Sequence, residues 1–251
     1  MARSLFWLSD EAWKTLEPHL PHGKPGKPRV DDRIVISGIL HVLKTGCRWR
    51  DVPPAFGPPT TIYNRSNRWS QRRIWQRIFE KMAAAGPVPD ELSIDSRHVK
   101  AHRAAAGSKR GSSRKRLAVR AAGTSKIHAL ADDRGSPVAF ALTPGNVADI
   151  TMAAPLLGAV ARPKRLLADK AYDADSLRKW LKQRKVKAVV PSTASRRTPY
   201  PLDSRAYKRR NLIERMFCKL KNWRRIATRY DRYAQNYLSG LALAAIMIAW
   251  I

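Results

Sequence analysis

Two acidic residues in the second half of the sequence stand where a carboxylate could bind a cation. Asp95 ends the run ELSID, and Asp169 ends the run RLLAD. Each follows a predicted buried strand, which is a costly place for a charge unless a cation is held there. Ligands of open α/β sheets bind beyond the strand ends. The two positions together therefore predict a cation-binding site. For either acid taken alone, a purely structural role as a turn or helix-cap residue is the alternative.

A third carboxylate, Glu214, lies on a predicted amphipathic helix in RRNLIERMFCKLKNW. Arg210, Glu214 and Lys221 share one face of that helix because they are spaced by four and seven residues. An ordinary ion pair between Arg210 and Glu214 is the simpler interpretation. Together with Asp95 and Asp169, Glu214 would form a hard oxygen site for Mg²⁺ or Mn²⁺. Two such ions could activate a water or a 3′-hydroxyl and stabilise the leaving oxygen in phosphoryl transfer.

The charge of the chain predicts a polyanionic partner. Lys and Arg number 49 against 19 Asp and Glu, which gives a formal net charge of +30. Such an excess is typical of nucleic-acid binding. The stretch 101–123 is basic and has no acid, so we expect DNA contacts there, with a solvated loop as the alternative. The residues expected to make these contacts are Lys109, Arg110, Arg114, Lys115 and Arg116.

The pattern of elements changes near residue 88. Before it, helical patterns dominate, with helices predicted over 31–44 and 60–73, the second capped by Thr60. After it, three strands, a helix, a strand, a helix and a strand precede closing helices, which is a mixed α/β arrangement. We therefore expect a small all-α domain over 1–87 and an α/β domain over 88–251.

The predicted helix over 60–73 is the expected DNA reader of the N-terminal domain. It carries side chains that can contact base edges in a major groove, although a purely structural helix is the alternative. These side chains belong to Asn64, Arg65, Asn67 and Arg68.

Other features restrict the class of protein. Cys47 and Cys218 are the only cysteines, which excludes a disulfide scaffold and a four-cysteine zinc site and suits a reducing compartment. The apolar end of the chain is shorter than the roughly 20 residues of a membrane span, so we expect a buried helix there. No signal peptide and no Walker loop is evident. A cytoplasmic, nucleoid-associated protein that needs no membrane and no ATP is expected.

Several motifs carry a resemblance to a known family. Tyr207, Arg210, Glu214 and Lys221 have the spacing of the Tyr-Arg-Glu-Lys signature of bacterial insertion-sequence transposases of the DDE type. The blocks IDSRHVKAHR, KIHALADDRGSPVAFALTPGNVAD, LLADKAYDAD and RRNLIERMFCKLKNWRRIATRYD resemble the insertion sequence 5 family in order, and residues 30–70 resemble its DNA-binding region. One departure is Ser66, where related sequences usually place a bulky aromatic residue.

The resemblance implies an RNase H-like catalytic domain, a mixed sheet with flanking helices, behind a helix-turn-helix-like DNA-binding domain. It implies Asp95, Asp169 and Glu214 as the catalytic, metal-binding triad and places Tyr207 and the two cations of the signature against DNA. The implied activity is binding of the element's own terminal repeats, DNA cleavage and strand transfer with two Mg²⁺ or Mn²⁺ ions, by a homodimer or higher oligomer. A DNA-binding regulator without chemistry and an RNase H-like nuclease without strand transfer are the alternatives.

Overall fold

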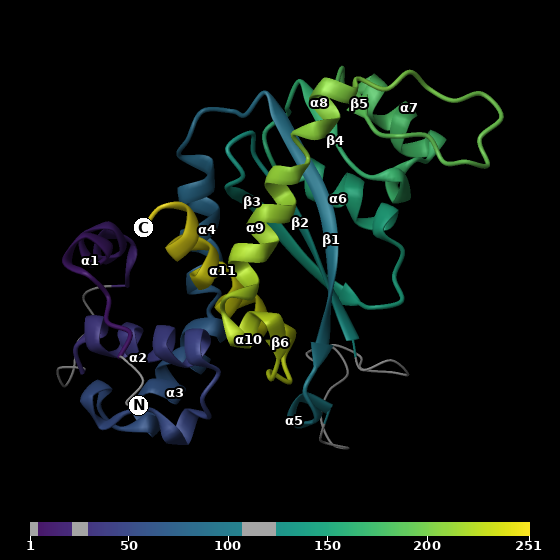
Figure 1. The fold of residues 1–251 in the computed structure, drawn as a ribbon. Coiled ribbons are helices and arrows are strands. Elements are labelled where there is room, and N and C mark those ends of the chain that lie inside the picture. The colour runs from purple at the N-terminus through teal and green to yellow at the C-terminus, as the bar shows by residue number, and fades with distance from the viewer. Residues whose placement is uncertain (1–4, 22–29, 107–123) are drawn as a thin grey trace. The chain divides into compact units, whose positions relative to one another are not determined.

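The computed structural model describes residues 5–21, 30–106 and 124–251 (Figure 1). These residues form two compact units. The helical unit comprises residues 5–21, 30–79, 102–106 and 220–251, and the sheet unit comprises 80–101 and 124–219. The last 32 residues, 220–251, thus pack with the N-terminal helices, whereas the sequence analysis groups them with the segment from 88 onward. The predicted functional domain boundary near 87 stays a prediction.

The first helices of the helical unit begin and end at residues suited to these positions. Helix α1 (Asp10–Leu16) begins after Ser9, whose hydroxyl accepts a hydrogen bond from the Ala12 amide. Helix α2 (Asp32–Thr45) begins after Asp31 and ends at Gly46, whose φ of 74° is the left-handed conformation that glycine adopts without strain. The predicted helix over 31–44 is confirmed to within one residue at each end.

Helix α3 (Pro59–Gln71) corrects one prediction. Thr60 is not its N-cap, because the helix already includes Pro59 and the capping position is held by Pro58. A proline at the first helical position loses no hydrogen bond, and its fixed φ suits the helix. Arg73, with a φ of 54°, separates α3 from helix α4 (Ile74–Ala84).

The C-terminal part of the helical unit is built from helix α10 (Arg224–Ala227), strand β6 (Thr228–Arg229) and helix α11 (Ala234–Ala249). Helix α11 is buried over most of its length, and the Tyr237 hydroxyl donates a 2.6 Å hydrogen bond to the Ile226 carbonyl. A short helix α5 (Arg103–Ala106) also belongs to this unit. The predicted buried C-terminal helix is confirmed, and none of the described helices is long and apolar enough to cross a membrane.

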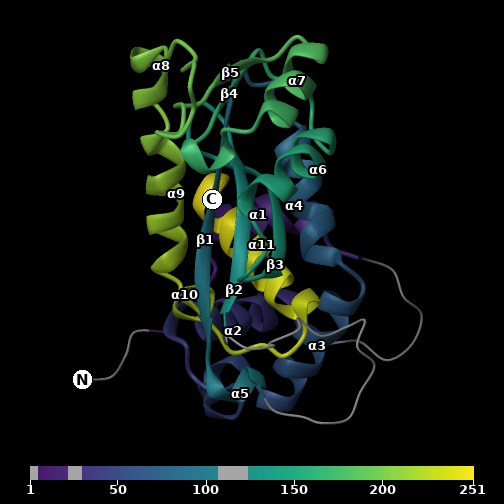
Figure 2. The same cartoon turned by 90° about the vertical axis from the view of Figure 1, so that its right-hand side faces the viewer.

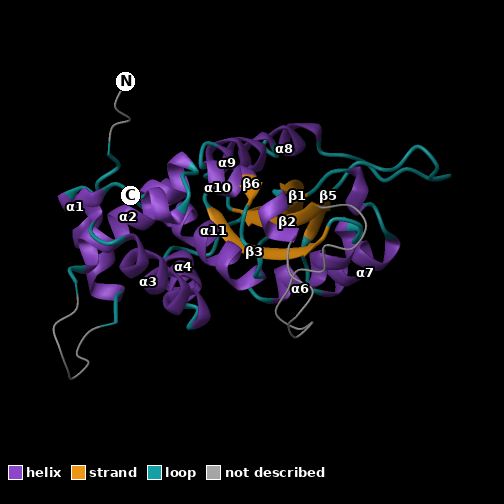
Figure 3. Cartoon of the chain, turned by 90° about the horizontal axis from the view of Figure 1, so that it is seen from below, coloured by secondary structure: helices purple, strands orange, loops and turns teal. Residues whose placement is uncertain are grey.

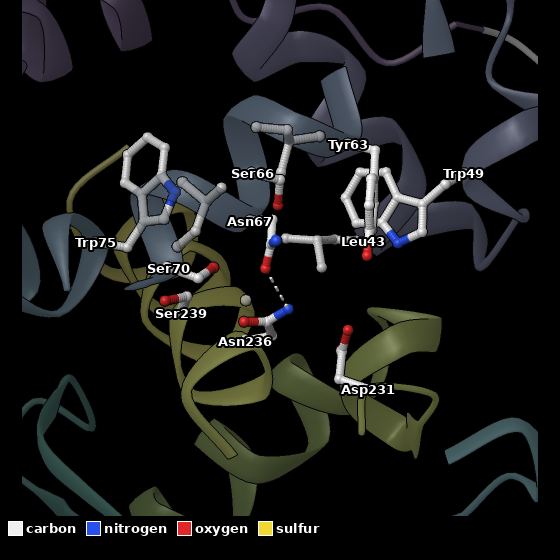
Figure 4. Close-up of a pocket in the computed structure, with 13 residues that line it drawn as sticks. Leu43, Trp49, Tyr63, Ser66, Asn67, Ser70, Trp75, Asp231, Asn236 and Ser239 are labelled. Atoms are coloured by element: carbon white, nitrogen blue, oxygen red, sulfur yellow. Dashed lines mark hydrogen bonds between the residues drawn. The ribbon is translucent and has the colours of Figure 1, made fainter. Parts of the chain in front are cut away.

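A small pocket of about 20 Å³, lined by both apolar and polar side chains, lies between α3 and α11 (Figure 4). It is large enough for about one water molecule. Ser66 and Ser70 line it from α3, and the Asn236 amide donates a 3.2 Å hydrogen bond to the Asn67 side-chain oxygen across it. The small side chain of Ser66 therefore leaves space in this pocket where an aromatic residue would add volume.

The sheet unit contains strands β1 (Glu91–Ala101), β2 (Thr124–Ala131), β3 (Pro137–Pro144), β4 (Arg165–Leu167) and β5 (Lys187–Val189) in the order β3-β2-β1-β4-β5. Strands β1, β2 and β3 pair antiparallel, and β1, β4 and β5 pair parallel. Helix α6 (Ala153–Gly158) precedes β4, and α7 (Asp175–Gln183) precedes β5. The predicted order of elements is confirmed, and the strand order with its single antiparallel meander defines an RNase H-like fold.

Helices cover both faces of this sheet (Figures 2 and 3). Helices α6 and α7 pack on one face, with Leu92 and Ile94 of β1 in their core cluster. Helix α9 (Asn211–Lys221), which follows helix α8 (Ser204–Lys208), lies on the other face, where the Arg97 guanidinium is 5.9 Å from the Phe217 ring. Because side chains alternate along a strand, Asp95 shares the face of Arg97 and points toward α9.

A buried histidine on β2 makes the stability of the sheet unit depend on pH. His128 is fully buried, and its Nε2 atom lies 2.8 Å from the Thr143 hydroxyl. Burial, aided by the charges of Lys126 and His98 and opposed by Asp149, lowers the pKa of His128 from 6.5 to about 4. The unfolded chain therefore binds a proton between these pH values while the folded chain does not.

We expect the free energy of unfolding to fall as the pH is lowered from 6.5 toward 4, because protonation favours the unfolded chain. His128→Gln keeps a hydrogen-bonding side chain but cannot titrate, so its unfolding free energy should fall less over the same interval. Urea denaturation at several pH values measures both. Identical slopes for the two proteins would contradict this assignment of the pH dependence.

Candidate active site

The parallel pairing of β1 with β4 places Asp95 beside Asp169. Ser93 pairs with Leu167, and each aspartate lies two residues farther along its strand direction. Residues at matching positions of adjacent parallel strands face the same side, about 4.8 Å apart. Asp169 is the first residue of the turn after β4, and its side chain accepts a 2.9 Å hydrogen bond from the Ala171 amide. Both predicted strand-end acids are thus brought together.

Asp95 is a buried carboxylate with one unsatisfied oxygen. Its side chain is 7% exposed, and Oδ1 accepts a 2.8 Å hydrogen bond from the Ser96 amide. Arg97 Nη2 lies 3.1 Å from Oδ2, yet Oδ2 has no hydrogen-bond donor. Burial raises the pKa of Asp95; the nearby Asp169 adds to this rise, while Arg97, the Ser96 amide and Arg210 oppose it.

Glu214 is joined to Asp95 through two guanidinium groups. Arg210 lies 2.5 Å from Glu214 Oε1 and 3.7 Å from Asp95 Oδ2. Arg97 lies 3.8 Å from the same Glu214 oxygen. The simple i,i+4 pair on α9 therefore exists, but it is part of a larger network that links α9 to β1.

The donor set of this network suits a hard divalent cation. A buried carboxylate oxygen without a hydrogen-bond donor, next to a second carboxylate, is the kind of ligand that Mg²⁺ or Mn²⁺ prefers. Within the described ranges, however, no three acidic, histidine or cysteine residues are already arranged to hold a metal ion. Arg97 and Arg210 hold Asp95 and Glu214 in ion pairs, so coordination by all three carboxylates needs these guanidinium groups to move.

Arg97 is the residue of this network that the sequence analysis misses. The available signal was its spacing: it follows Asp95 by two residues on the same predicted strand and so faces the same side. What the sequence did not show is that α9 covers this face and brings Glu214 within reach.

Of the signature residues on α8, on α9 and in the turn between them, only some lie close to the carboxylates. The Tyr207 ring is half-buried beside Leu167 and Val189, and its centre lies 5.8 Å from the Arg210 guanidinium carbon. Lys221 is the last residue of α9 and is exposed to solvent. Tyr207 and Arg210 therefore approach the carboxylates, whereas Lys221 lies two helical turns beyond Glu214.

The four side chains expected to read DNA on α3 point in different directions. Asn64 and Arg68 are exposed. Arg65 is buried, pairs with Asp32 at the start of α2 and lies against the Trp69 ring, so it holds α2 and α3 together. The Asn67 side chain accepts its hydrogen bond from Asn236. The structure thus gives Arg65 and Asn67 packing partners and leaves Asn64 and Arg68 on the solvent face; contact of any of the four with DNA stays a prediction.

A second predicted DNA-contacting set cannot be placed. These residues lie in the stretch 107–123, outside the described part of the chain, and are Lys109, Arg110, Arg114, Lys115 and Arg116.

Comparisons with known proteins define the class to which this fold and site belong. Residues 86–249 match the family profile described as "Transposase DDE domain". Residues 8–79 match the profile described as "Putative transposase of IS4/5 family". Because the first match covers more than half of the chain, the chain belongs to the DDE transposase family, whose members are metal-dependent enzymes that cleave and join DNA.

Within the DDE transposase family, two curated relatives are described as transposases of insertion sequences. The chain is 36% identical over 129 residues to the "Putative transposase for insertion sequence element IS6501" of Brucella ovis, covering 51% of this chain and 98% of the relative. It is 33% identical over 137 residues to the "Putative transposase for insertion sequence element IS402" of Burkholderia cepacia, covering 50% of this chain and 63% of the relative. The predicted resemblance to insertion-sequence transposases is confirmed.

Solved structures with some likeness to this chain are more distant. A piggyBac transposase synaptic complex with hairpin DNA matches with 14% identity and a TM-score of 0.40, over 76% of this chain and 50% of that chain. A pre-cleavage Mos1 transpososome matches with 10% identity and a TM-score of 0.29, over 83% and 80% of the two chains. The assignment of fold and family therefore depends on the strand order and the sequence matches.

The buried charge of Asp95 should destabilise the metal-free protein. We expect Asp95→Asn to raise the thermal unfolding temperature by about 2–4 °C, because the amide is nearly isosteric and removes a desolvated negative charge beside Asp169. Differential scanning calorimetry in EDTA measures the change. Asp133→Asn, at an exposed position of the hairpin turn, is the comparison variant and should leave the temperature nearly unchanged, because a surface substitution of this kind has little effect on stability. A lower unfolding temperature for Asp95→Asn would contradict the account of Asp95.

Proposed function

We propose that this transposase binds the terminal repeats of its own insertion sequence, cleaves the DNA at those ends and joins them to a target. In this proposal Asp95, Asp169 and Glu214 hold two divalent ions, Mg²⁺ or Mn²⁺. The observation that carries the proposal is that Asp95 on β1 interacts with Asp169, two residues beyond the paired parallel strand β4, while Glu214 is linked to Asp95 through Arg97 and Arg210. The match of residues 86–249 to the DDE profile supports it.

Bound ions would supply an activated water or 3′-hydroxyl and charge stabilisation at the leaving oxygen. The protein's own groups position the DNA. Arg97 and Arg210 now neutralise two carboxylates, and a metal ion would take over that task. Both guanidinium groups would then be available to a phosphate of the bound strand, which they can bind in the same fork geometry as a carboxylate.

The remaining signature residues would hold the end of the element. Lys221 is seven residues beyond Glu214, about 10.5 Å along the helix axis, which suits contact with a neighbouring phosphate rather than proton transfer. Tyr207 lies against Arg210 and would help to fix its orientation.

Helix α3 would recognise the terminal repeat. Its solvent face carries Tyr63, Asn64, Arg68 and Gln71, and Asn, Gln and Arg are the residue types that make bidentate contacts with adenine and guanine in the major groove. The buried pair of Arg65 with Asp32 would support this face rather than contact DNA.

A strand-transfer assay separates this function from the two alternatives. Two element ends must be held together before joining, so we propose a homodimer or higher oligomer on DNA. A transposase cleaves an oligonucleotide that carries the terminal repeat and joins it to a second duplex. A regulator does neither, and a nuclease cleaves without joining.

The three carboxylates should behave as one catalytic unit. We expect Asp95→Asn, Asp169→Asn and Glu214→Gln each to reduce end cleavage by about 10³-fold or more, because each removes a metal ligand. Binding of terminal-repeat DNA should stay within about twofold, since phosphate contacts come from Lys and Arg. Gel-shift and cleavage assays with Mg²⁺ test this. The matched control Asp133→Asn, on the hairpin turn, should retain activity; a triad variant that cleaves at the control's rate would remove that residue from the site.

Substitutions on the solvent face of α3 should affect recognition and leave the chemistry intact. We expect Asn64→Ala and Arg68→Ala each to weaken terminal-repeat binding by about 1–3 kcal/mol with little change in binding to random DNA. Competition gel shifts measure the ratio of the two affinities. Arg77→Ala, an exposed arginine on α4, is the control of equal charge. An unchanged ratio for both α3 variants would assign end recognition to another element.

A further inference from the structure

A basic surface at the far end of the sheet unit has no role in the functions described above. It lies where α7 ends and where β4 and β5 begin (Figure 2). We call it the α7–β5 surface; its exposed cations are Arg162, Lys164, Lys179, Lys182, Lys185 and Lys187.

Backbone contacts bring the three segments of this surface together. The Lys187 amide donates a 2.9 Å hydrogen bond to the Lys164 carbonyl, where β5 pairs with β4. The Arg162 guanidinium donates a 3.3 Å hydrogen bond to the Arg184 carbonyl just after α7. The pairing of β4 with β5 and the contact made by Arg162 therefore hold the three segments together, and neither contact uses Lys179, Lys182 or Lys185.

The carboxylates near this surface do not neutralise it. Lys164 pairs with Asp90 at 3.0 Å, and Lys187 lies 4.0 Å from Asp203. Within the described ranges, no ion pair with a carboxylate is formed by Lys179, Lys182, Lys185 or Arg162. Lys179 and Lys182 are three residues apart on α7 and so lie on neighbouring positions of its surface. Lys185 follows two residues after the end of the helix.

Lys185 has a backbone conformation that a lysine adopts only at a cost. Its φ is 55°, in the left-handed region where glycine is unstrained. At this position, just after α7, glycine would end the helix equally well. The helix terminus needs no additional cation here, because Lys182 already lies in the last turn. The conformation itself closes α7, since the Lys185 and Val186 amides donate hydrogen bonds to the Lys182 and Leu181 carbonyls. The helix end does not, however, require a lysine rather than a glycine at this position.

We propose that the α7–β5 surface binds the backbone of the target DNA duplex during strand transfer; this inference rests on the proposed function. Five of its six cations are lysines, which act as point charges without the fixed fork geometry that reads guanine or carboxylates. Such a surface contacts phosphates and carries little sequence information. That suits a target duplex of varied sequence, in contrast to the Asn and Gln residues on the solvent face of α3.

The position of the surface agrees with this role. Lys164 of this surface, just before β4, precedes Asp169 by five residues, which is at most about 17 Å of extended chain. At 3.4 Å per nucleotide of one strand, this distance corresponds to about five nucleotides. A duplex seated on the lysines can therefore place a phosphate a few nucleotides away beside the carboxylates.

The test is a variant in which Lys179→Gln, Lys182→Gln and Lys185→Gly are combined. The last change removes a charge and also relaxes the backbone, so the variant should fold, as its thermal unfolding temperature will show. The matched control is Lys81→Gln, Lys100→Gln and Arg134→Gln, three exposed cations elsewhere in the sheet unit. Both are assayed as full-length proteins for end cleavage and for joining of pre-cleaved ends, which carry no flanking DNA, to a target duplex.

We expect the α7–β5 variant to join pre-cleaved ends at least tenfold less efficiently than the wild type while end cleavage stays within twofold. A separate gel shift measures how the affinity of the variant for random duplex depends on salt. The slope of log affinity against log salt concentration should be smaller in magnitude by up to about 2.7, because three phosphate contacts are lost. An equal loss of joining in the control variant with three substitutions would overturn the proposal. So would a loss of activity seen only with ends that still carry flanking DNA. The gel shift needs no catalysis, so an unchanged slope would overturn the inference about the α7–β5 surface whether or not the wild type joins DNA. A wild type that cannot join pre-cleaved ends would instead overturn the proposed function.

Discussion

The constraint on which the candidate site depends is the burial of the Asp95 carboxylate on β1, with a second carboxylate, Asp169, just beyond the neighbouring parallel strand β4. Asp95 is buried and Asp169 lies at the adjacent position, so both burial and the neighbouring charge raise the pKa of Asp95. Side-chain alternation along β1 turns Asp95 away from the core formed with α6 and α7 and toward α9. The free energy that this arrangement costs is offset by two nearby cations and by the Ser96 amide, which donates a hydrogen bond to Asp95.

In the described structure those cations are Arg97 and Arg210. Arg97 is anchored on the same strand as Asp95, and Arg210 extends from the start of α9, so the two guanidinium groups also fix α9 against the sheet. In the proposed function the same arrangement would prepare the site for chemistry, because a divalent ion would replace the guanidinium groups at the carboxylates. The displaced arginines would then lie beside the phosphate on which the ion acts. In the proposed function, one electrostatic requirement would thus account both for the arginine contacts seen here and for the binding of a metal ion together with DNA.

The sequence was sufficient to predict those features that depend on local pattern. Strand alternation, apolar runs and the acids that end them identified Asp95 and Asp169, and helical spacing placed Glu214 with Arg210. Features that depend on tertiary packing were not predictable in the same way. Arg65 was expected to face DNA like its neighbours, but the carboxylate of Asp32, 33 positions earlier, holds it in the interior. Thr60 failed as a cap because Pro58 and Pro59 allow α3 to begin two residues earlier than a cap at Thr60 would require. The packing of 220–251 with the N-terminal helices likewise follows from contacts between distant segments.

The central claim is that the carboxylates of Asp95, Asp169 and Glu214 bind the catalytic metal once the arginines release them. The most direct measurement is the anomalous X-ray scattering of Mn²⁺ in crystals of the protein bound to terminal-repeat DNA. The account predicts one or two Mn²⁺ peaks at ligand distance from the Asp95 and Asp169 carboxylates, with Arg97 and Arg210 turned toward the DNA backbone. Mn²⁺ bound elsewhere, or an end complex in which both arginines still pair with Asp95 and Glu214, would contradict it.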